Sequence, residues 1–116
     1  MVSFPGARFD DDSIYPLINL VSLFMNQYTS YEDPGHGWLA VPRAELIALG
    51  IENQISECSY MDAIYAYLEE DCDRAVFESA METAGIEFDI KTIEQDEDSF
   101  IRDCERYSCL KASTLQ

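Results

Sequence analysis

Apolar residues recur at steps of three and four between residues 14 and 28, the period of one face of a helix. Ser13 suits the N-cap, and Pro16 falls in the first turn, where its missing N–H costs little. We therefore predict a helix over residues 14–28. Leu20 and Leu23 lie beside its apolar stripe and face either the core or a second molecule, so a homodimer through this helix is one hypothesis.

The next segment combines the signals of a turn and a strand. Residues 31–35, with the sequence YEDPG, suit a turn in which Gly35 takes a positive φ. Residues 36–41 then alternate as a strand does, which places His36 and Trp38 on the same side and the intervening residues on the other. A histidine beside a tryptophan is either a ligand platform or a pair shaped by packing.

Proline, glycine and aspartate mark the ends of the later helices. Pro42 suits the start of a short helix that Gly50 ends, and Asp73 suits the N-cap of a longer helix that Gly85 ends. Apolar and polar residues alternate on each side of the longer helix, which predicts two strands. The predicted elements are a helix over 42–49, a loop over 51–63, a strand over 64–69, a helix over 73–84 and a strand over 86–93.

These elements predict an α+β fold, in which one small domain packs a short sheet against about three helices. Polar alternation along the strands predicts one sheet face in solvent and helices over the other. Residues 94–99 are predicted to be a solvated acidic loop, and residues 100–110 either a last strand or a short helix. The single domain covers residues 1–116, with a helical extension over 1–30, an α+β core over 31–110 and a frayed tail over 111–116.

Charge narrows the choice of partners. The 116 residues include 7 lysines and arginines against 23 aspartates and glutamates, a formal net charge of −16. Such a surface repels phosphate backbones and attracts basic proteins, so direct nucleic-acid binding is disfavoured. The apolar runs are short, and no basic segment precedes a long apolar one. We therefore expect no membrane span and predict a cytoplasmic location.

Candidate catalytic and metal-binding residues are sparse. Four cysteines, 14, 32 and 5 positions apart, match neither zinc knuckles nor a small disulfide framework. His36 is the only histidine, and the carboxylates next to Cys72 in sequence oppose a reactive thiolate. Residues 94–105 place carboxylates as a calcium loop does, but Ser99 stands where that loop needs glycine. We therefore expect no metal, no cofactor and no enzymatic activity.

Several stretches together resemble a family of short uncharacterised proteins of bacteria, plasmids and phages. They are DPGHGWLAVPRAELIALGI, AYLEEDCD, a helix that bears phenylalanine, and a late DSFIR. The likeness covers residues 31–102. It implies an α+β domain and carries over no catalytic residue, while the first thirty residues and the EQDED insert lie outside it.

The acidic composition favours a non-enzymatic interaction protein. One such protein is a phage or mobile-element inhibitor, of the anti-CRISPR or anti-restriction type, that binds a host nucleic-acid-binding defence complex by charge mimicry. The carboxylates expected on its docking surface are Glu69, Glu70, Asp71, Asp73, Glu87, Asp89, Glu94, Asp96, Glu97 and Asp98. The first alternative is that the charge serves solubility alone. The second is a ligand-binding or enzymatic domain whose pocket contains His36, Trp38, Tyr65 and Tyr67.

Overall fold

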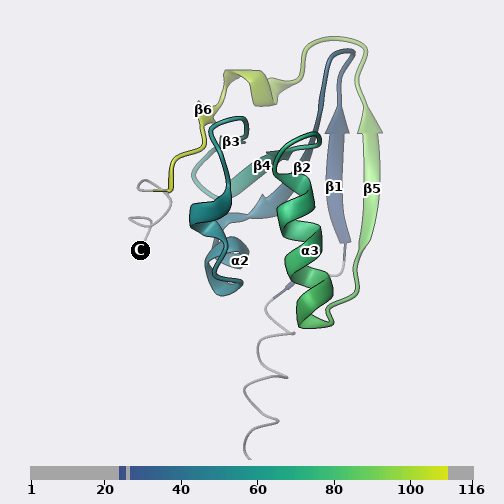
Figure 1. Ribbon diagram of the computed structural model, residues 1–116. Coiled ribbons are helices and arrows are strands. Elements are labelled where there is room, and N and C mark those ends of the chain that lie inside the picture. The colour runs from purple at the N-terminus through teal and green to yellow at the C-terminus, as the bar shows by residue number, and fades with distance from the viewer. Residues whose placement is uncertain (1–23, 26, 110–116) are drawn as a thin grey trace, which may run out of the picture.

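The computed structural model describes residues 24, 25 and 27–109 of the chain. These residues form a mixed six-stranded sheet in the order β5-β1-β2-β4-β3-β6 (Figure 1). The strands are β1 (Gln27–Glu32), β2 (Gly37–Pro42), β3 (Tyr60–Met61), β4 (Tyr65–Glu69), β5 (Asp89–Glu94) and β6 (Glu105–Arg106). The helices are α2 (Arg43–Ala48), α3 (Arg74–Ala84) and the short 3-10 helices η1 (Glu52–Gln54) and η2 (Phe100–Asp103).

The sheet dominates the described residues, so the prediction of a short sheet packed against about three helices is wrong. The described residues contain two α-helices, and α2 has only 6 residues against 11 in α3. β3 lies inside the predicted loop over 51–63, and β1 begins inside the predicted helix over 14–28. Pairing with strands distant in sequence decides both segments, and local periodicity carries no information about such partners.

The first predicted helix does not reach its predicted end, because residues 27 and 28 belong to β1. Tyr28 is fully buried, and its ring packs edge-on against Phe77 and Phe88 at 5.1 and 5.5 Å between ring centroids. The remainder of that prediction, including Leu20 and Leu23, lies outside the described residues. The homodimer hypothesis that depends on these two leucines stays a prediction.

Three strands form the centre of the sheet. β1 and β2 are antiparallel, with Tyr31 opposite Trp38, and β2 and β4 are antiparallel, with Leu39 opposite Leu68. β5 pairs with β1 in the parallel direction and forms one edge, at the right of Figure 1. α3 connects β4 to β5, and α2 and α3 contribute to one hydrophobic core on the same sheet face.

Apolar side chains cover both faces of the sheet, so the predicted solvated face is wrong. Leu39 and Val41 belong to the core under α2 and α3. Trp38, Ala40, Tyr67 and Ile101 form a second core on the other face. Ile101 comes from η2, so a segment more than thirty residues from β4 in sequence closes the face that the alternation had left to solvent.

Several predicted elements agree with the structure. The strand over 36–41 corresponds to β2 with its predicted alternation, and the strand over 64–69 corresponds to β4. The helix over 73–84 corresponds to α3, which Gly85 ends at φ 72°. The strand over 86–93 begins later, at residue 89. Gly50, at φ 73°, and Gly85 are the described glycines with positive φ, so Gly35 does not have the predicted conformation.

Candidate functional site

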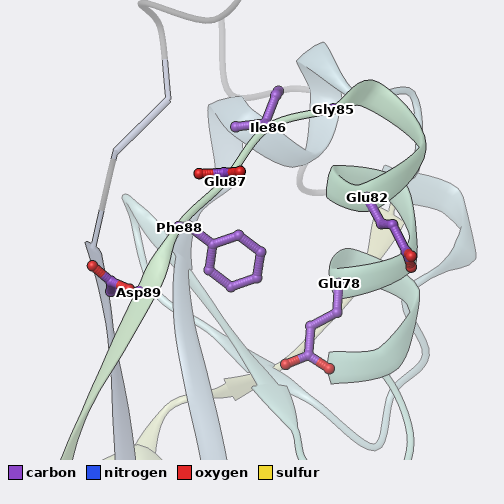
Figure 2. Close-up of a pocket in the computed structure, with 7 residues that line it drawn as sticks. All are labelled: Glu78, Glu82, Gly85, Ile86, Glu87, Phe88 and Asp89. Atoms are coloured by element: carbon purple, nitrogen blue, oxygen red, sulfur yellow. The ribbon is translucent and has the colours of Figure 1, made fainter.

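An acidic groove of about 740 Å³ lies between the C-terminal half of α3 and the segment that leads into β5 (Figure 2). Glu78 and Glu82 are four residues apart and therefore share one face of α3. Gly85 then reverses the chain through its left-handed conformation, which brings Glu87 and Asp89 to the opposite wall. We define the acidic groove by these four carboxylates.

The floor of the acidic groove is apolar and belongs to the core. Ile86 is buried, and Figure 2 shows the ring of Phe88 directed toward α3. That ring lies 5.7 Å from the ring of Phe77, measured between centroids. Among the described residues that line the groove none is basic, although Arg74 Nε lies 3.1 Å from Glu78 Oε2. The groove therefore has an apolar base between negatively charged walls.

A second group of carboxylates lies at the opposite end of β5. Glu32 is the register partner of Glu94. A Cβ atom on Gly37 would lie 2.9 Å from Glu70 Oε1 and 3.2 Å from Glu32 Cγ, so both side chains cover this glycine. We call Glu32, Glu70 and Glu94 the sheet-end cluster. The loop that follows β5 adds Asp96, Glu97 and Asp98, all of them exposed.

Eight of the ten predicted docking carboxylates are exposed, but Glu69 and Asp73 are only 7% and 3% exposed. Those two do not belong to a docking surface. The exposed eight do not form one wall either, because they gather at the two ends of β5 and in the β4–α3 turn. A strand of six residues separates its ends by roughly 17 Å, and Lys91 lies between them.

Three of the described arginines donate hydrogen bonds to other groups of the chain. Arg43 is buried and donates to the carbonyl of Asp62. Arg102 Nε and Nη2 donate to the two carboxylate oxygens of Asp33 at 2.7 and 3.0 Å. Arg106 donates to backbone carbonyls of the loop before β3. These arginines thus bind oxygen atoms of the same chain, while most described carboxylates are exposed to solvent.

An aromatic pocket of about 370 Å³ lies on the sheet face that η2 covers. Its lining residues are His36, Trp38, Cys58, Tyr60, Glu69, Asp71, Cys72, Arg102 and Arg106. His36 Nδ1 lies 3.1 Å from Glu69 Oε2. The guanidinium carbon of Arg102 lies 5.2 Å from the Trp38 ring centroid, and that of Arg106 lies 4.5 Å from the Tyr60 ring centroid. Both are cation–π contacts.

The two predicted pocket tyrosines do not join His36 and Trp38 in the aromatic pocket. Tyr65 and Tyr67 line a separate hollow of about 130 Å³, together with Tyr31. The hydroxyl of Tyr67 donates to Asp62 Oδ2 at 2.6 Å, and burial, followed by this contact, raises the pKa of Tyr67. The predicted grouping of four residues is therefore not found, because Tyr67 lies opposite Ala40 in the sheet and not opposite Trp38.

Asp73 and Asp33 have structural roles inside the fold, although nothing in the sequence separates them from the exposed carboxylates. Asp73 occupies the predicted N-cap position of α3 but makes no side-chain cap hydrogen bond. Its Oδ2 instead accepts hydrogen bonds from Ser56 N, Ser56 Oγ and Ser59 Oγ at 3.0, 2.9 and 2.6 Å. Asp33 accepts from the backbone N–H groups of Gly35 and Ser99. Arg102 first, and these backbone bonds as well, hold the pKa of Asp33 well below its usual range.

The described residues were compared with metal-site and membrane-span geometry, and the chain with known proteins. No group of three or more histidine, cysteine, aspartate or glutamate side chains in the described residues could hold a metal ion. Within the same residues, no helix has the length and apolar character to cross a membrane. No family model, curated protein or solved structure matches the chain. The resemblance to short bacterial, plasmid and phage proteins therefore stays a prediction.

Sequence reasoning missed some members of both acidic groups. Glu78 and Glu82 were not among the predicted carboxylates, although their spacing of four on the predicted helix was a visible signal. Glu32 joins Glu94 only through the parallel pairing of β1 with β5, for which the sequence offered no signal. The shared pocket of Cys58 and Cys72 likewise depends on the tertiary fold.

Proposed function

We propose that this chain is a non-enzymatic acidic interaction protein that docks on the basic, nucleic-acid-binding surface of a host defence complex. In this proposal it is a phage or mobile-element inhibitor of the anti-CRISPR or anti-restriction type and acts in the cytoplasm. The observation that supports it is the gathering of exposed carboxylates at the two ends of β5, while Arg43, Arg102 and Arg106 bind oxygen atoms of the same chain.

Charge acts in this proposal by competition. Carboxylates occupy the positions that phosphates take on a basic surface, and their field speeds encounter with that surface. The screening length at physiological ionic strength is about 8 Å, shorter than the separation of roughly 17 Å between the ends of β5. The acidic groove and the sheet-end cluster therefore act as two patches, each of which needs its own basic counterpart on the partner.

Competition for DNA tests the proposal directly. A restriction enzyme or a CRISPR effector complex is mixed with labelled target DNA, and the chain is titrated in while DNA binding is followed by fluorescence anisotropy. We expect release of the DNA, and an affinity of the chain for the enzyme that weakens roughly tenfold or more between about 50 and 200 mM salt. Affinity that does not change with salt would exclude charge mimicry.

Matched variants locate the contact. Glu82→Gln with Glu87→Gln removes two charges from the acidic groove, whereas Glu57→Gln with Asp103→Asn removes two exposed charges elsewhere. We expect the groove variant to lose inhibition and to show a shallower salt dependence, and the control to inhibit as the parent does. Equal losses in the two variants would mean that only total charge matters.

The aromatic pocket supports a second candidate, a small-ligand site. Its aromatic walls and the half-exposed imidazole of His36, held by Glu69, provide apolar surface and a polar group that fixes orientation. His36→Ala removes that group with little effect on the core, whereas Trp38 is buried and its truncation would cost about 3 to 5 kcal/mol of stability. DNA-binding inhibition that is lost in His36→Ala but kept in the groove variant would favour this candidate over charge mimicry.

A further inference from the structure

Two cysteines from different segments meet at the aromatic pocket. Cys58 lies in the turn before β3, and Cys72 lies in the turn between β4 and α3. Both side chains line the pocket, and both residues are exposed. Interaction with Cys58 raises the pKa of Cys72. The two cysteines therefore open onto the same pocket and are accessible to reagents in solution.

Hydrogen bonds beside each cysteine hold the two segments together. Asp73, the residue after Cys72, binds Ser56 and Ser59, which lie on either side of Cys58. Ser59 Oγ also accepts a hydrogen bond from Glu69 N at 3.0 Å. These contacts involve the buried side chains of Asp73 and Ser59. The fold itself therefore sets the approach of the two cysteines.

The other two cysteines provide an internal comparison. Cys104 and Cys109 are partly buried, and neither lines the aromatic pocket. Burial is the main cause that raises the pKa of Cys104, whose thiol donates to the backbone carbonyl of Phe100 at 3.9 Å. Oxidation of an unfolded chain would not favour the pair of Cys58 and Cys72 over the other pairs of the four cysteines. In the folded chain Cys58 and Cys72 line the same pocket, so we expect these two to pair.

We propose that Cys58 and Cys72 form a reversible intramolecular disulfide by exchange with a low-molecular-weight disulfide such as oxidised glutathione. In the first step the thiolate of one cysteine attacks a sulfur of the reagent, forms a mixed disulfide and releases one glutathione thiolate. In the second step the other cysteine loses its proton, attacks the protein sulfur of the mixed disulfide and releases the second glutathione thiolate. Two electrons pass from the protein to the reagent, and the two protons end on two glutathione molecules.

Local charge slows the first step. Interaction with Cys58, loss of solvation and the nearby Glu69 carboxylate raise the pKa of Cys72. The thiolate is the attacking species, so mildly alkaline pH speeds the reaction. Either cysteine makes the first attack, and the other makes the closing attack. Closure is intramolecular and so proceeds at a high effective concentration.

The disulfide would alter the aromatic pocket and the start of α3. Both sulfur atoms lie on the pocket wall, so the bond would replace two polar thiols by a fixed bridge. It would also join the turn before β3 covalently to the residue that precedes Asp73. Neither residue lines the acidic groove. Partner binding through that groove should therefore be unaffected, and this inference does not depend on the proposed function.

Peptide mapping of the native protein tests the pair. The reduced full-length chain is incubated with oxidised glutathione at mildly alkaline pH, alkylated, digested without reduction and analysed by mass spectrometry. We expect a product that has lost two hydrogen atoms, with the peptide of Cys58 joined to the peptide of Cys72, and recovery of both thiols after dithiothreitol. The double variant Cys104→Ser with Cys109→Ser should give the same product.

Three results would overturn the proposal. They are stable glutathione adducts on Cys58 and Cys72 without a crosslink, a crosslink that involves Cys104 or Cys109 in comparable yield, and equal yields of all pairings in native protein and in protein unfolded in urea. The single variant Cys72→Ser supplies the matched control, in which we expect a glutathione adduct on Cys58 that no second thiol resolves. Circular dichroism of each sample confirms that the fold is retained.

Discussion

Buried acidic side chains in this protein are held in three chemically different ways. Asp33 is paired with a guanidinium, Asp73 accepts hydrogen bonds from serines, and Glu45 accepts from the hydroxyl of Tyr28 at 2.6 Å. Burial is the main cause that raises the pKa of Glu45, whereas Arg102 lowers that of Asp33. Burial alone therefore does not predict the direction of a shift, because the partner decides whether the charged or the neutral form is favoured.

The pair of Asp33 and Arg102 makes a residue-scale prediction. Asp33→Asn should lower the free energy of unfolding near neutral pH by about 2 kcal/mol, because charge-assisted hydrogen bonds to a buried side chain are lost. The folded-state pKa of Asp33 lies below that of the unfolded chain, so its stabilisation is present above the usual carboxyl pKa of about 3.9 and is lost as the pH falls below it.

Urea denaturation at about pH 7 and about pH 3 checks this prediction, with the exposed Asp103→Asn as control. The difference between parent and Asp33→Asn should shrink at the lower pH, because the unfolded parent then binds a proton at Asp33 that the folded parent does not. Asp103→Asn should stay close to the parent at both values. A difference that grows toward low pH would contradict the assigned direction of the shift.

α3 and β5 show how a short connection builds a surface. The helix ends at Gly85, and the chain turns so tightly that carboxylates from the helix and from the following segment face the same groove. A Cβ atom on Gly85 would meet no heavy atom within 4 Å, so the cost of any other residue there is conformational rather than steric. The same holds for Gly50 after α2.

Gly85→Ala makes the prediction at the scale of elements. An L residue at φ 72° costs about 1 kcal/mol relative to glycine, and Gly50→Ala should cost about the same for the same reason. Gly35 is not at positive φ, but its added Cβ would lie 2.9 Å from the Arg102 Nη2 that binds Asp33, so Gly35→Ala tests that contact and not the backbone conformation. Urea denaturation curves of Gly85→Ala and Gly50→Ala give the two losses. A negligible loss in both would show that positive φ is not the cause.

Net charge is the property that belongs to the molecule as a whole. A formal charge of −16 on 116 residues opposes the compact state by self-repulsion, which local contacts do not reveal. The sheet-end cluster is one place where like charges gather, because Glu32 and Glu70 lie against the same glycine. Surface repulsion is screened by salt, whereas the buried pair of Asp33 and Arg102 is screened much less.

Salt should therefore stabilise this protein. We expect the melting temperature to rise by a few degrees between about 10 mM and 500 mM sodium chloride, because the screening length falls from about 30 Å to a few ångströms. Glu82→Gln with Glu87→Gln should raise the melting temperature at low salt and reduce its salt dependence. Calorimetry provides both values. A melting temperature that falls with salt would show that attractive surface pairs outweigh the repulsion.

The sequence by itself determined the elements whose ends and faces are set by neighbours in the chain. Gly85 ends α3 where predicted, and the alternation of Leu39 and Val41 against Trp38 and Ala40 gave the two faces of β2. Net charge is a sum and also needed no structure. Whether a given carboxylate is exposed to solvent could be predicted only in part, because Glu69 and Glu70 are adjacent in sequence yet Glu69 is buried and Glu70 is exposed.

Only the tertiary structure decided what depends on contacts between distant segments. β1 and β5 pair in parallel across about sixty residues, and this pairing gathers Glu32 with Glu94 and makes a strand of residues whose local spacing suited a helix. η2 covers the second sheet face, and Asp73 brings Cys58 to Cys72 through Ser56 and Ser59. Such contacts follow from the burial and hydrogen bonding of the whole chain, and local propensity does not encode them.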